Sequence, residues 1–475
     1  MKLDNLRVAQ SNINIGDPHI CSDSLNRNSL ISAIYEPLIE RKGPGIFYPS
    51  LARSWSVESG GLTWGFKLRE GVFFHNGDEF SSADVIASLK RIVDPSLGGA
   101  FGTQGVYASY IGEARFEAPR KDIVKISTTE PMADLLDLLS EMPIAPKDEL
   151  DNISKEYLGT GSYYVGSKTR GEIVLDRNRD HWGKKAFFDE VSVIEEAKSR
   201  VRSEMVLERD VNIGALIDFN DTVMHQKSEK TYLYSLKSSL CIIFMMNALN
   251  GPCSDQRIRQ ALNYGLDVDD VIKKVKIGQA TRLNGYLTPH HFGFNMQTEP
   301  YPYDPERARA LLREAGHDTG LKLTIDLPTE MPDEAPLLGE IMKEYYDRLG
   351  IDVELVSYRD RPAYAEMVRN KRIHDLCCFD SSPLSTFRVL REKIHSAHKG
   401  PWWEGYSNSE VDEMIDQAQR TFDDKKREKL YEQIFQKIRD DAPWVFLYRP
   451  TYFWALSKEL PDWNPTSTGL LNLVE

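Results

Sequence analysis

The clearest periodic pattern in the chain lies between about residues 321 and 358. The segment LKLTIDL alternates apolar and polar residues, as a strand with one buried face does. Apolar residues then recur at helical spacing as far as Gly350, a residue that favours the end of a helix, and IDVELVSY alternates again. Strand, helix and strand of these lengths predict a βαβ unit with parallel strands and a right-handed crossover.

Other patterns add helices and strands on both sides of this unit. In YDPERARALLREAGH, Asp304 suits the N-cap, Pro305 the first helical position and Gly316 the helix end. Two more helices are predicted in SEVDEMIDQAQRTF and KKREKLYEQIFQKIRDD, followed by a buried strand in PWVFLYRPTYFWAL. The first half predicts mainly short strands, in LTWGFKLREGVFF, DIVKISTT and GEIVLDRN, with a helix in SSADVIASLKRIVD. These patterns predict an α/β chain with two lobes.

Length and charge narrow the class of protein. A chain of 475 residues is too long for one ordinary core, which predicts two or three structural units. A formal charge of -13 argues against a nucleic-acid partner and against anionic membranes. No apolar run reaches the ~20 residues of a membrane span. The five cysteines are scattered and odd in number, so they predict no disulfide framework. A single Cys241–Cys253 disulfide remains an alternative if the protein lies outside the cytoplasm.

Catalytic and metal-binding signatures are scarce. The GTGS stretch at 159–162 lacks the Lys-Ser/Thr of a phosphate-binding loop and predicts a tight turn. The close histidine pairs, His290-His291 and His395/His398, have no nearby cysteine or clear carboxylate partner, which favours surface or core histidines over a metal site. Cys377-Cys378 is interpreted as two small buried hydrophobes at a strand end. These residues therefore predict no metal site and no cofactor.

The stretch GPWWEGYSN, residues 400–408, places two tryptophans between turn-forming residues. Gly400-Pro401 and Gly405 predict a loop around Trp402 and Trp403. Large apolar rings are normally avoided on surface loops, so the pair is expected to grip a ligand or to plug the space under a neighbouring helix.

Several sequence blocks, in one order along the chain, carry a family resemblance. They begin with YEPLIERKGPGIFYPSLARSWSVESGGLTWGFKLREGVFFHNGDEFSSADVIASLKR and continue through GTGSYYV and IVLDRNRDHWG. They resume at SDQRIRQALNYGLD, YDPERARALLREAGH and LGIDVELVSYRDRPAYAEMV, and end with DAPWVFLY. Together they resemble the peptide/nickel/opine class (family 5) of solute-binding proteins that feed ABC importers, over nearly the whole chain.

This resemblance implies a bilobal fold of the type II periplasmic-binding-protein kind, with an extra subdomain in the N-terminal lobe. The chain would cross between lobes near 238–247 and return near 446–452. Residues 1–240 and 450–475 would then form the N-terminal lobe, and residues 241–449 the C-terminal lobe. The lobes would close around a solute without catalysis.

The resemblance also implies a location and partners. Family members are secreted through a signal peptide that is later removed, which predicts that this sequence is a mature periplasmic chain. The absence of a lipid-attachment cysteine near its start favours a free periplasmic protein. The expected partners are a small-molecule solute and the membrane permease subunits of an ABC importer, with no nucleic acid, and the chain is expected to be a monomer.

Candidate binding residues follow from the positions that match the family. Trp402, Trp403 and Tyr406 lie where relatives carry a pocket-lining segment with a Gly-Tyr-x-Asn ending, and Trp403 is the first choice. Asp380, in FDSSPLSTFR, lies where many relatives have an acidic residue that pairs with a peptide's amino terminus. This sequence departs from their Trp-x-x-Asp-Tyr-Pro-Asp-Pro-like pattern, which leaves a loop-capping role for Asp380 equally open and puts a peptide ligand in doubt.

Four further positions complete the candidate set. Arg388 and Arg391 could hold a ligand carboxylate or phosphate, although local ion pairing is the commoner role of such arginines. Asn247 matches a cleft-facing position at the crossing strand. Cys21, with Ser22 beside it, lies where relatives present a side chain from the first loop.

Three functions are compatible with these observations. The first is a periplasmic receptor for a short peptide, an opine-like conjugate or a modified sugar. The second is a nickel or metal-chelate receptor of the same fold, in which a histidine completes the metal shell. The third is a cleft hydrolase with two carboxylates, which no residue spacing supports.

Overall fold

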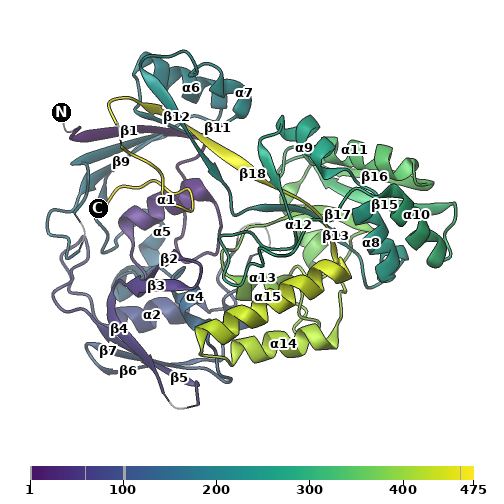
Figure 1. Ribbon diagram of the computed structural model, residues 1–475. Coiled ribbons are helices and arrows are strands. Elements are labelled where there is room, and N and C mark those ends of the chain that lie inside the picture. Colours follow the sequence, from purple (N-terminus) through teal and green to yellow (C-terminus); the bar gives the residue numbers. More distant parts are fainter. Residues whose placement is uncertain (1–2, 59, 100–102, 184, 461, 475) are drawn as a thin grey trace.

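The computed structural model describes residues 3–58, 60–99, 103–183, 185–460 and 462–474. It shows an α/β protein with two lobes that lie side by side, the N-terminal lobe in purple to teal and the C-terminal lobe mainly in green (Figure 1). The lobes are named here by the predicted division at residues 240/241 and 449/450. The predicted α/β class and bilobal arrangement are confirmed.

One long strand, β18 (Trp444–Ser457), belongs to the sheets of both lobes and runs between them in Figure 1. Its first part pairs with β13 (Cys241–Met246), up to the pair Ile242–Tyr448. Its last part, residues 451–457, pairs with β12 (Thr231–Lys237) and also contacts β11 (Ile213–Ile217). The chain therefore passes from one sheet to the other between β12 and β13 and returns within β18.

Because β18 pairs with strands of both lobes, the two sheets form one continuous 12-stranded sheet. Its strand order is β16-β15-β17-β13-β18-β11-β1-β10-β9-β8, and β12 and β14 also pair with β18. The other strands in the C-terminal lobe are β14 (Ala280–Arg282), β15 (Leu321–Pro328), β16 (Ile351–Tyr358) and β17 (Leu376–Ser381). Those in the N-terminal lobe are β1 (Asn5–Gln10), β8 (Tyr163–Lys168), β9 (Glu172–Arg177) and β10 (Glu190–Glu195).

The predicted βαβ unit is present. Strands β15 and β16 pair in parallel from Leu321–Ile351 to Pro328–Tyr358, and α11 (Ala335–Asp347) connects them. Gly350 closes the helix with a φ of 83°, in the left-handed region that favours glycine. The apolar periodicity therefore predicted the two strands and the helix correctly, and it also predicted which of their side chains are buried.

The C-terminal lobe has an apolar core on each face of its sheet. Successive residues of β13 alternate between the two cores, with Ile242 and Phe244 on one face and Cys241 and Ile243 on the other. A strand buried on both faces reads as one continuous apolar run, which explains the sequence CIIFMM. The helices of this lobe are α8 (Gln256–Tyr264), α9 (Val268–Lys276), α10 (Pro305–Glu314), α11 (Ala335–Asp347), α12 (Arg361–Arg369), α13 (Thr386–Lys393), α14 (Ser409–Gln419) and α15 (Asp424–Asp441), with a 3-10 turn at Pro252–Ser254.

The N-terminal lobe contains a second unit with its own core, in agreement with the extra subdomain that the resemblance implies. Its four-stranded sheet has the order β4 (Ala52–Val57), β5 (Thr63–Leu68), β7 (Ile123–Ser127) and β6 (Arg115–Arg120), and a hairpin of β2 (Ile39–Gly43) and β3 (Ile46–Pro49) lies beside it. The helices of the whole lobe are α1 (Leu25–Ile34), α2 (Ser82–Ile92), α3 (Ala108–Ile111), α4 (Leu135–Leu139), α5 (Ile153–Glu156), α6 (Ser199–Glu208) and α7 (Phe219–Thr222), with a 3-10 turn at Lys147–Asn152.

The GTGS stretch is a bend that packs against the end of α1. The backbone N–H of Gly161 donates to the carbonyl oxygen of Ile34 at 2.9 Å. A Cβ atom on Gly159 would lie 2.0 Å from the same oxygen, so only glycine fits. The glycines serve close backbone packing, which agrees with a structural role for this stretch, although it forms a bend and not a hydrogen-bonded turn.

The two lobes are in contact along the extra subdomain. Phe387 of α13 is buried in the apolar core of that subdomain, with its ring 5.5 Å from the ring of Tyr110. The backbone N–H of Ala133 donates to the carbonyl oxygen of Gln419 at 2.8 Å. The structure therefore represents an arrangement in which the lobes are closed on each other.

All five cysteines are free and buried. Cys241 and Cys253 lie in the cores on opposite faces of the sheet, so the possible bridge between them is not formed. Cys377 and Cys378 follow one another on β17 and also point to opposite faces, and burial raises the pKa of both thiols well above the usual value. Their interpretation as small buried hydrophobes is confirmed. Among the described residues, no helix has the length and apolar character needed to cross a membrane.

The N-cap of α10 provides a test of the local sequence signals. The Asp304 carboxylate accepts a hydrogen bond from the backbone N–H of Arg307 at 2.8 Å. Replacing Asp304 by Ala should lower the free energy of unfolding by about 1 kcal/mol, because the N–H loses its acceptor. Asp304→Asn keeps an acceptor and should melt close to the parent protein in calorimetry. Equal melting of both variants would show that the cap contributes nothing.

Candidate functional site

Ionisable side chains from both lobes gather where the C-terminal lobe meets the extra subdomain. We call this group the interlobe charge cluster, and it consists of Asp23, Glu141, Asp380, Arg388, Glu392 and Lys393. Helix α13 supplies three of its members within six positions, and β17 supplies another at its end. A helix and a strand of the rigid core therefore fix most of the cluster.

Arg388 is the centre of the cluster and only 2% of its side chain is exposed. Its guanidinium lies 2.8 Å from Glu141 of the N-terminal lobe and 3.1 Å from Glu392, one turn later on α13. Asp23 lies 3.4 Å away and the Cys21 sulfur 3.3 Å away. Although burial opposes its charge, the acidic groups around it hold the pKa of Arg388 above the usual range. A ligand carboxylate would have to replace one of these acids to reach the guanidinium.

Asp380 and Lys393 differ from the rest of the cluster because they lack close partners. Within the described residues, the Asp380 carboxylate has no side-chain hydrogen-bond partner, and the charges that favour its ionised form are those of Arg361 and Lys393. Lys393 is 97% buried, and its nearest acidic partner, Glu392, is 3.9 Å away. Burial raises the pKa of Asp380 and lowers that of Lys393, while the charge of each group favours the ionised form of the other.

Side chains of the C-terminal lobe and of β18 surround Asp380. The guanidinium of Arg361 lies 5.3 Å from the ring centroid of Phe379, and its charge favours the ionised form of Asp380. On β18, burial raises the pKa of Tyr452 to about 12, and the charge of Asp380 adds to this effect. The surroundings thus combine aromatic rings with a cation, which suits a small polar solute that has an apolar body.

The first loop of the chain reaches the same region. The Ser382 hydroxyl donates to Asp23 at 2.9 Å, across the lobe contact. Cys21, two residues earlier, lines a cavity of about 10 Å³ with His19 and Tyr107, which is too small for a solute. Burial raises the pKa of the Cys21 thiol to about 12. The structure places Cys21 beside Arg388, as a packed side chain of the cluster.

The two tryptophans of the 400–408 loop are buried in the C-terminal lobe. Trp402 belongs to an apolar core, and its ring centroid lies 4.9 Å from that of Phe379. The Trp403 indole N–H donates to the carbonyl oxygen of Tyr406 at 2.7 Å. Trp402 thus contacts Phe379, the residue before Asp380 on β17. Trp403 stabilises the loop itself.

Hydrogen bonds and backbone shape also fix this loop. The Tyr406 hydroxyl donates to the Asp441 carboxylate at 2.6 Å, which attaches the loop to the end of α15. Gly405 has a φ of 96°, and a Cβ atom there would lie 2.2 Å from the backbone nitrogen of Leu249. The loop is therefore a packed, specified segment. These contacts favour the structural role of the three rings, and their contact with a ligand stays a prediction.

Two other predicted residues have local partners. The Asn247 amide donates to the backbone carbonyls of Ile373 at 3.3 Å and His374 at 3.0 Å, so it joins the end of β13 to the loop before β17. Arg391 lies on the next turn of α13 after Arg388 and donates to His398. Roles for both in solute binding stay predictions.

Sequence reasoning missed Glu141, Asp23, Glu392 and Lys393 as members of one cluster. Glu141 is 247 positions from Arg388, and Asp23 is 365 positions from it, so no local pattern could join them. Lys393 reads in the sequence as an ordinary basic residue in the last turn of a helix. The one local signal was the four-residue spacing of Arg388 and Glu392.

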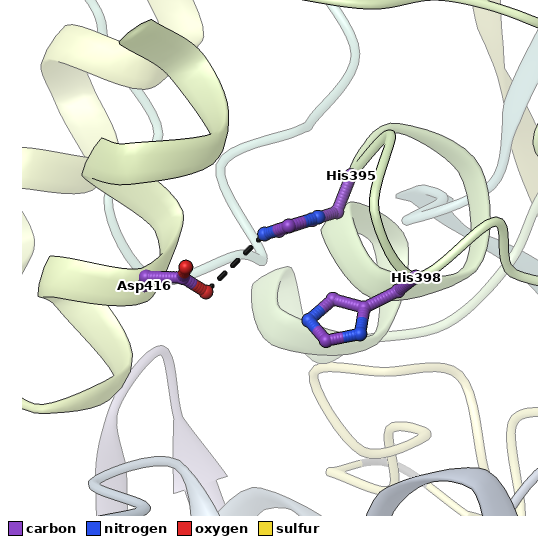
Figure 2. Close-up of side chains that lie close together, drawn as sticks. All are labelled: His395, His398 and Asp416. Carbon is purple, nitrogen blue, oxygen red and sulfur yellow. Dashed lines mark hydrogen bonds and ion pairs between the residues drawn. The ribbon is translucent and has the colours of Figure 1, made fainter. Parts of the chain in front are cut away.

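The two histidine pairs have different surroundings. His291 is buried and satisfied by Thr288 and by the carbonyl oxygen of Pro383, so it is a core histidine as expected. His395 instead lies 3.2 Å from Asp416, with His398 close by (Figure 2). The expectation that this pair lacks a carboxylate partner was wrong, because α14 brings in an aspartate from 21 positions away.

Trp402 gives a direct test of the structural role of the loop. Trp402→Ala should lower the free energy of unfolding by about 3–5 kcal/mol, since it leaves a cavity in the core behind Phe379. Trp55→Ala, which removes a half-buried indole of β4 in the other lobe, is the matched control for a smaller loss. The measurements are the melting temperature and the dissociation constant of the retained solute. Unchanged melting with lost affinity would show that the Trp402 ring contacts the solute instead.

Glu404, in the same loop, predicts a pH dependence of stability. Both carboxylate oxygens are buried without a hydrogen-bond partner in the described part of the chain, and Lys371 is 3.9 Å away. Burial raises the pKa of Glu404 from 4.5 to about 8. Between these values the folded chain keeps a proton that the unfolded chain loses, so the free energy of unfolding falls as pH rises, by at most about 1.4 kcal/mol per pH unit.

Glu404→Gln removes this titration and keeps the shape of the side chain. The variant should melt close to the parent protein at pH 5 and become increasingly more stable than it between pH 5 and 8. Calorimetry across that range measures the difference. A constant difference in melting temperature would mean that Glu404 is ionised in the folded protein.

Comparisons with known proteins agree with this arrangement. The model of one protein family, described as "Bacterial extracellular solute-binding proteins, family 5 Middle", matches residues 47–382 of this chain. The glutathione-binding protein GsiB of Escherichia coli K12 is 25% identical over 476 residues, which cover 97% of this chain and 91% of that protein.

Two solved structures share the fold. The periplasmic binding protein DppA of Helicobacter pylori, in complex with the peptide STSA, is 24% identical with a TM-score of 0.81, covering 99% of this chain and 96% of that chain. AgaA of A. tumefaciens R10, in complex with agropinic acid, is 21% identical with a TM-score of 0.78, covering 96% and 93%. The bilobal fold, the closed contact between lobes and the match over most of the chain lead to one conclusion: this protein belongs to the family 5 extracellular solute-binding proteins, which are receptors of ABC importers and not enzymes.

Proposed function

We propose that this receptor captures a short zwitterionic peptide or peptide-like conjugate in the periplasm, with glutathione as the first candidate. The observation that carries the proposal is the pair Asp380 and Lys393, which lie at the lobe contact without close partners of their own. A carboxylate such as that of Asp380 accepts hydrogen bonds from an ammonium group of a solute, and the ammonium of Lys393 donates hydrogen bonds to a carboxylate of a solute. One solute that carries both charges would satisfy both side chains.

The energetic reason for this assignment is the cost of buried, unpaired charge. Burial raises the pKa of Asp380 and lowers that of Lys393, so burial opposes the charged form of each group. Charge-assisted hydrogen bonds to a solute would repay that cost, and they are stronger than bonds between neutral groups. Glu141 and Glu392 are already paired with Arg388, and these ion pairs serve mainly to fix how the lobes meet.

Lobe closure would enclose such a solute. Contacts such as Ser382–Asp23 and Arg388–Glu141 join opposite lobes, so they form only on closing. The guanidinium of Arg41 extends this contact, since it donates to the carbonyl oxygen of Leu384 at 2.9 Å. The N-terminal lobe would then shield a solute at Asp380 from water. Exclusion of water strengthens the electrostatic interactions between the solute and the protein.

Glutathione fits this arrangement because it carries one ammonium and two carboxylates. The relative GsiB is named for binding it, and other family members in the comparison were solved with a peptide and with agropinic acid. All of these ligands are small and carry charged groups. The proposal also includes a periplasmic protein that acts as a monomer and delivers its solute to the permease subunits of an ABC importer, without contacts to nucleic acid.

The test is calorimetric titration with glutathione, a neutral-side-chain tripeptide and an opine, after native mass spectrometry of the purified protein to identify any retained solute. Asp380→Asn and Lys393→Met should each weaken binding of the preferred solute at least about thirtyfold, since loss of one buried charge partner costs about 2–5 kcal/mol.

Asp352→Asn is the matched control, because Asp352 is an exposed carboxylate of β16 far from the cluster, and it should bind like the parent protein. Parent-like binding by both site variants would place the solute elsewhere. Preference for a nickel–histidine complex over all three organic solutes would favour the metal-chelate receptor instead.

A further inference from the structure

Two histidines and an aspartate come together outside the interlobe charge cluster. His395 lies just after α13, His398 lies three residues further along the loop, and Asp416 lies on α14 (Figure 2). One potential ligand atom from each lies within 4.8 Å of the others. The closest pair is the His395 Nε2 and the Asp416 carboxylate, at 3.2 Å, and the two imidazole centroids are 4.2 Å apart.

A second carboxylate lies behind His395. An oxygen of Asp412 is 3.7 Å from the His395 Nδ1, and the same carboxylate accepts a hydrogen bond from the backbone N–H of Ser396 at 3.0 Å. The His395 Nδ1 is buried and has no hydrogen-bond partner among the described residues. Metal-bound histidines commonly direct their second nitrogen to a carboxylate, which fixes the ring and increases its basicity. Asp412 is in the place that such a partner takes.

We propose that this chain binds one divalent transition-metal ion, of the Zn²⁺ type, through His395 Nε2, a ring nitrogen of His398 and the carboxylate of Asp416. Two imidazoles and one carboxylate form a ligand set that suits such ions. A tetrahedral ion with bonds of about 2.0–2.1 Å needs its ligand atoms about 3.3 Å apart, so the group must contract slightly. His398 is exposed and lies in a loop, so it can make that movement, and the exposed side leaves a fourth position open for water.

Arg391 is the feature that opposes binding. Its guanidinium donates to His398 Nε2 and places a positive charge beside the proposed ion. Binding must displace Arg391, which can still lie against the ring of Phe387, 5.7 Å from its guanidinium carbon.

The position of the site gives it a structural consequence. An ion would join the loop after α13 to α14, and the end of α14 contacts the N-terminal lobe through Gln419 and Arg420. This site is separate from Asp380 and Lys393, and solute binding does not require it.

The experiment uses the full chain, purified with chelator and then dialysed, with Zn²⁺ alone as the probe in calorimetric titration at pH 7 and Co²⁺ alone for its visible absorption. We expect uptake of one ion per chain and a higher melting temperature with the metal. His398→Ala and Asp416→Asn should each weaken binding at least tenfold, whereas Arg391→Gln should strengthen it, because it removes the competing cation and hydrogen bond.

His290→Ala is the matched control, since His290 belongs to the other histidine pair and bonds with the carbonyl oxygen of Lys237. This variant should bind Zn²⁺ as tightly as the parent protein does. Circular dichroism checks that each variant is folded. No saturable uptake by the parent protein would overturn the proposal, as would uptake that persists unchanged in both His398→Ala and Asp416→Asn.

Discussion

The arrangement of the two lobes depends on a buried guanidinium. Arg388 is 98% buried, and taking its charge out of water is compensated only because Glu141 and Asp23 approach from the N-terminal lobe while Glu392 approaches from its own helix. Removing one partner of such a buried pair costs about 3–5 kcal/mol, which makes the pairing a strict requirement of the closed arrangement. Phe387, one residue earlier on α13, adds apolar burial in the extra subdomain at the same contact.

This requirement explains why α13 and β17 carry so much of the candidate site. The C-terminal sheet is buried on both faces, so β17 is held rigidly and places Asp380 at its end, facing the other lobe. Helix α13 begins with a Ser385 cap and presents Arg388 to the acids, while Lys393 at its last turn lies near Asp380. The same few residues thus determine how the lobes meet and which charges are left for a solute.

The 400–408 loop supports this arrangement from behind. Trp402 backs Phe379, the neighbour of Asp380, and Tyr406 anchors the loop to α15 through Asp441. Aromatic residues in a loop suggest a binding surface, but here the rings of Trp402 and Tyr406 belong to an apolar core of the C-terminal lobe. A residue of this kind can influence solute binding through the position of β17 even when it does not touch the solute.

The sequence by itself determined the secondary structure and the family. The alternation in LKLTIDL and IDVELVSY, the Asp304-Pro305 start of α10 and the continuous apolar run of β13 are local signals, because the geometry of one strand or helix fixes their period. The ordered blocks of the resemblance then indicated the bilobal fold, and they pointed to Asp380 and Arg388 individually. Only the tertiary structure decided what these residues contact. Glu141 meets Arg388 across 247 positions and Asp416 meets His395 across 21, and neither distance corresponds to a period of helix or strand. Burial has the same origin, since Lys393 and Glu404 are ordinary charged residues in the sequence, and the packing of distant segments around them takes their charges out of water.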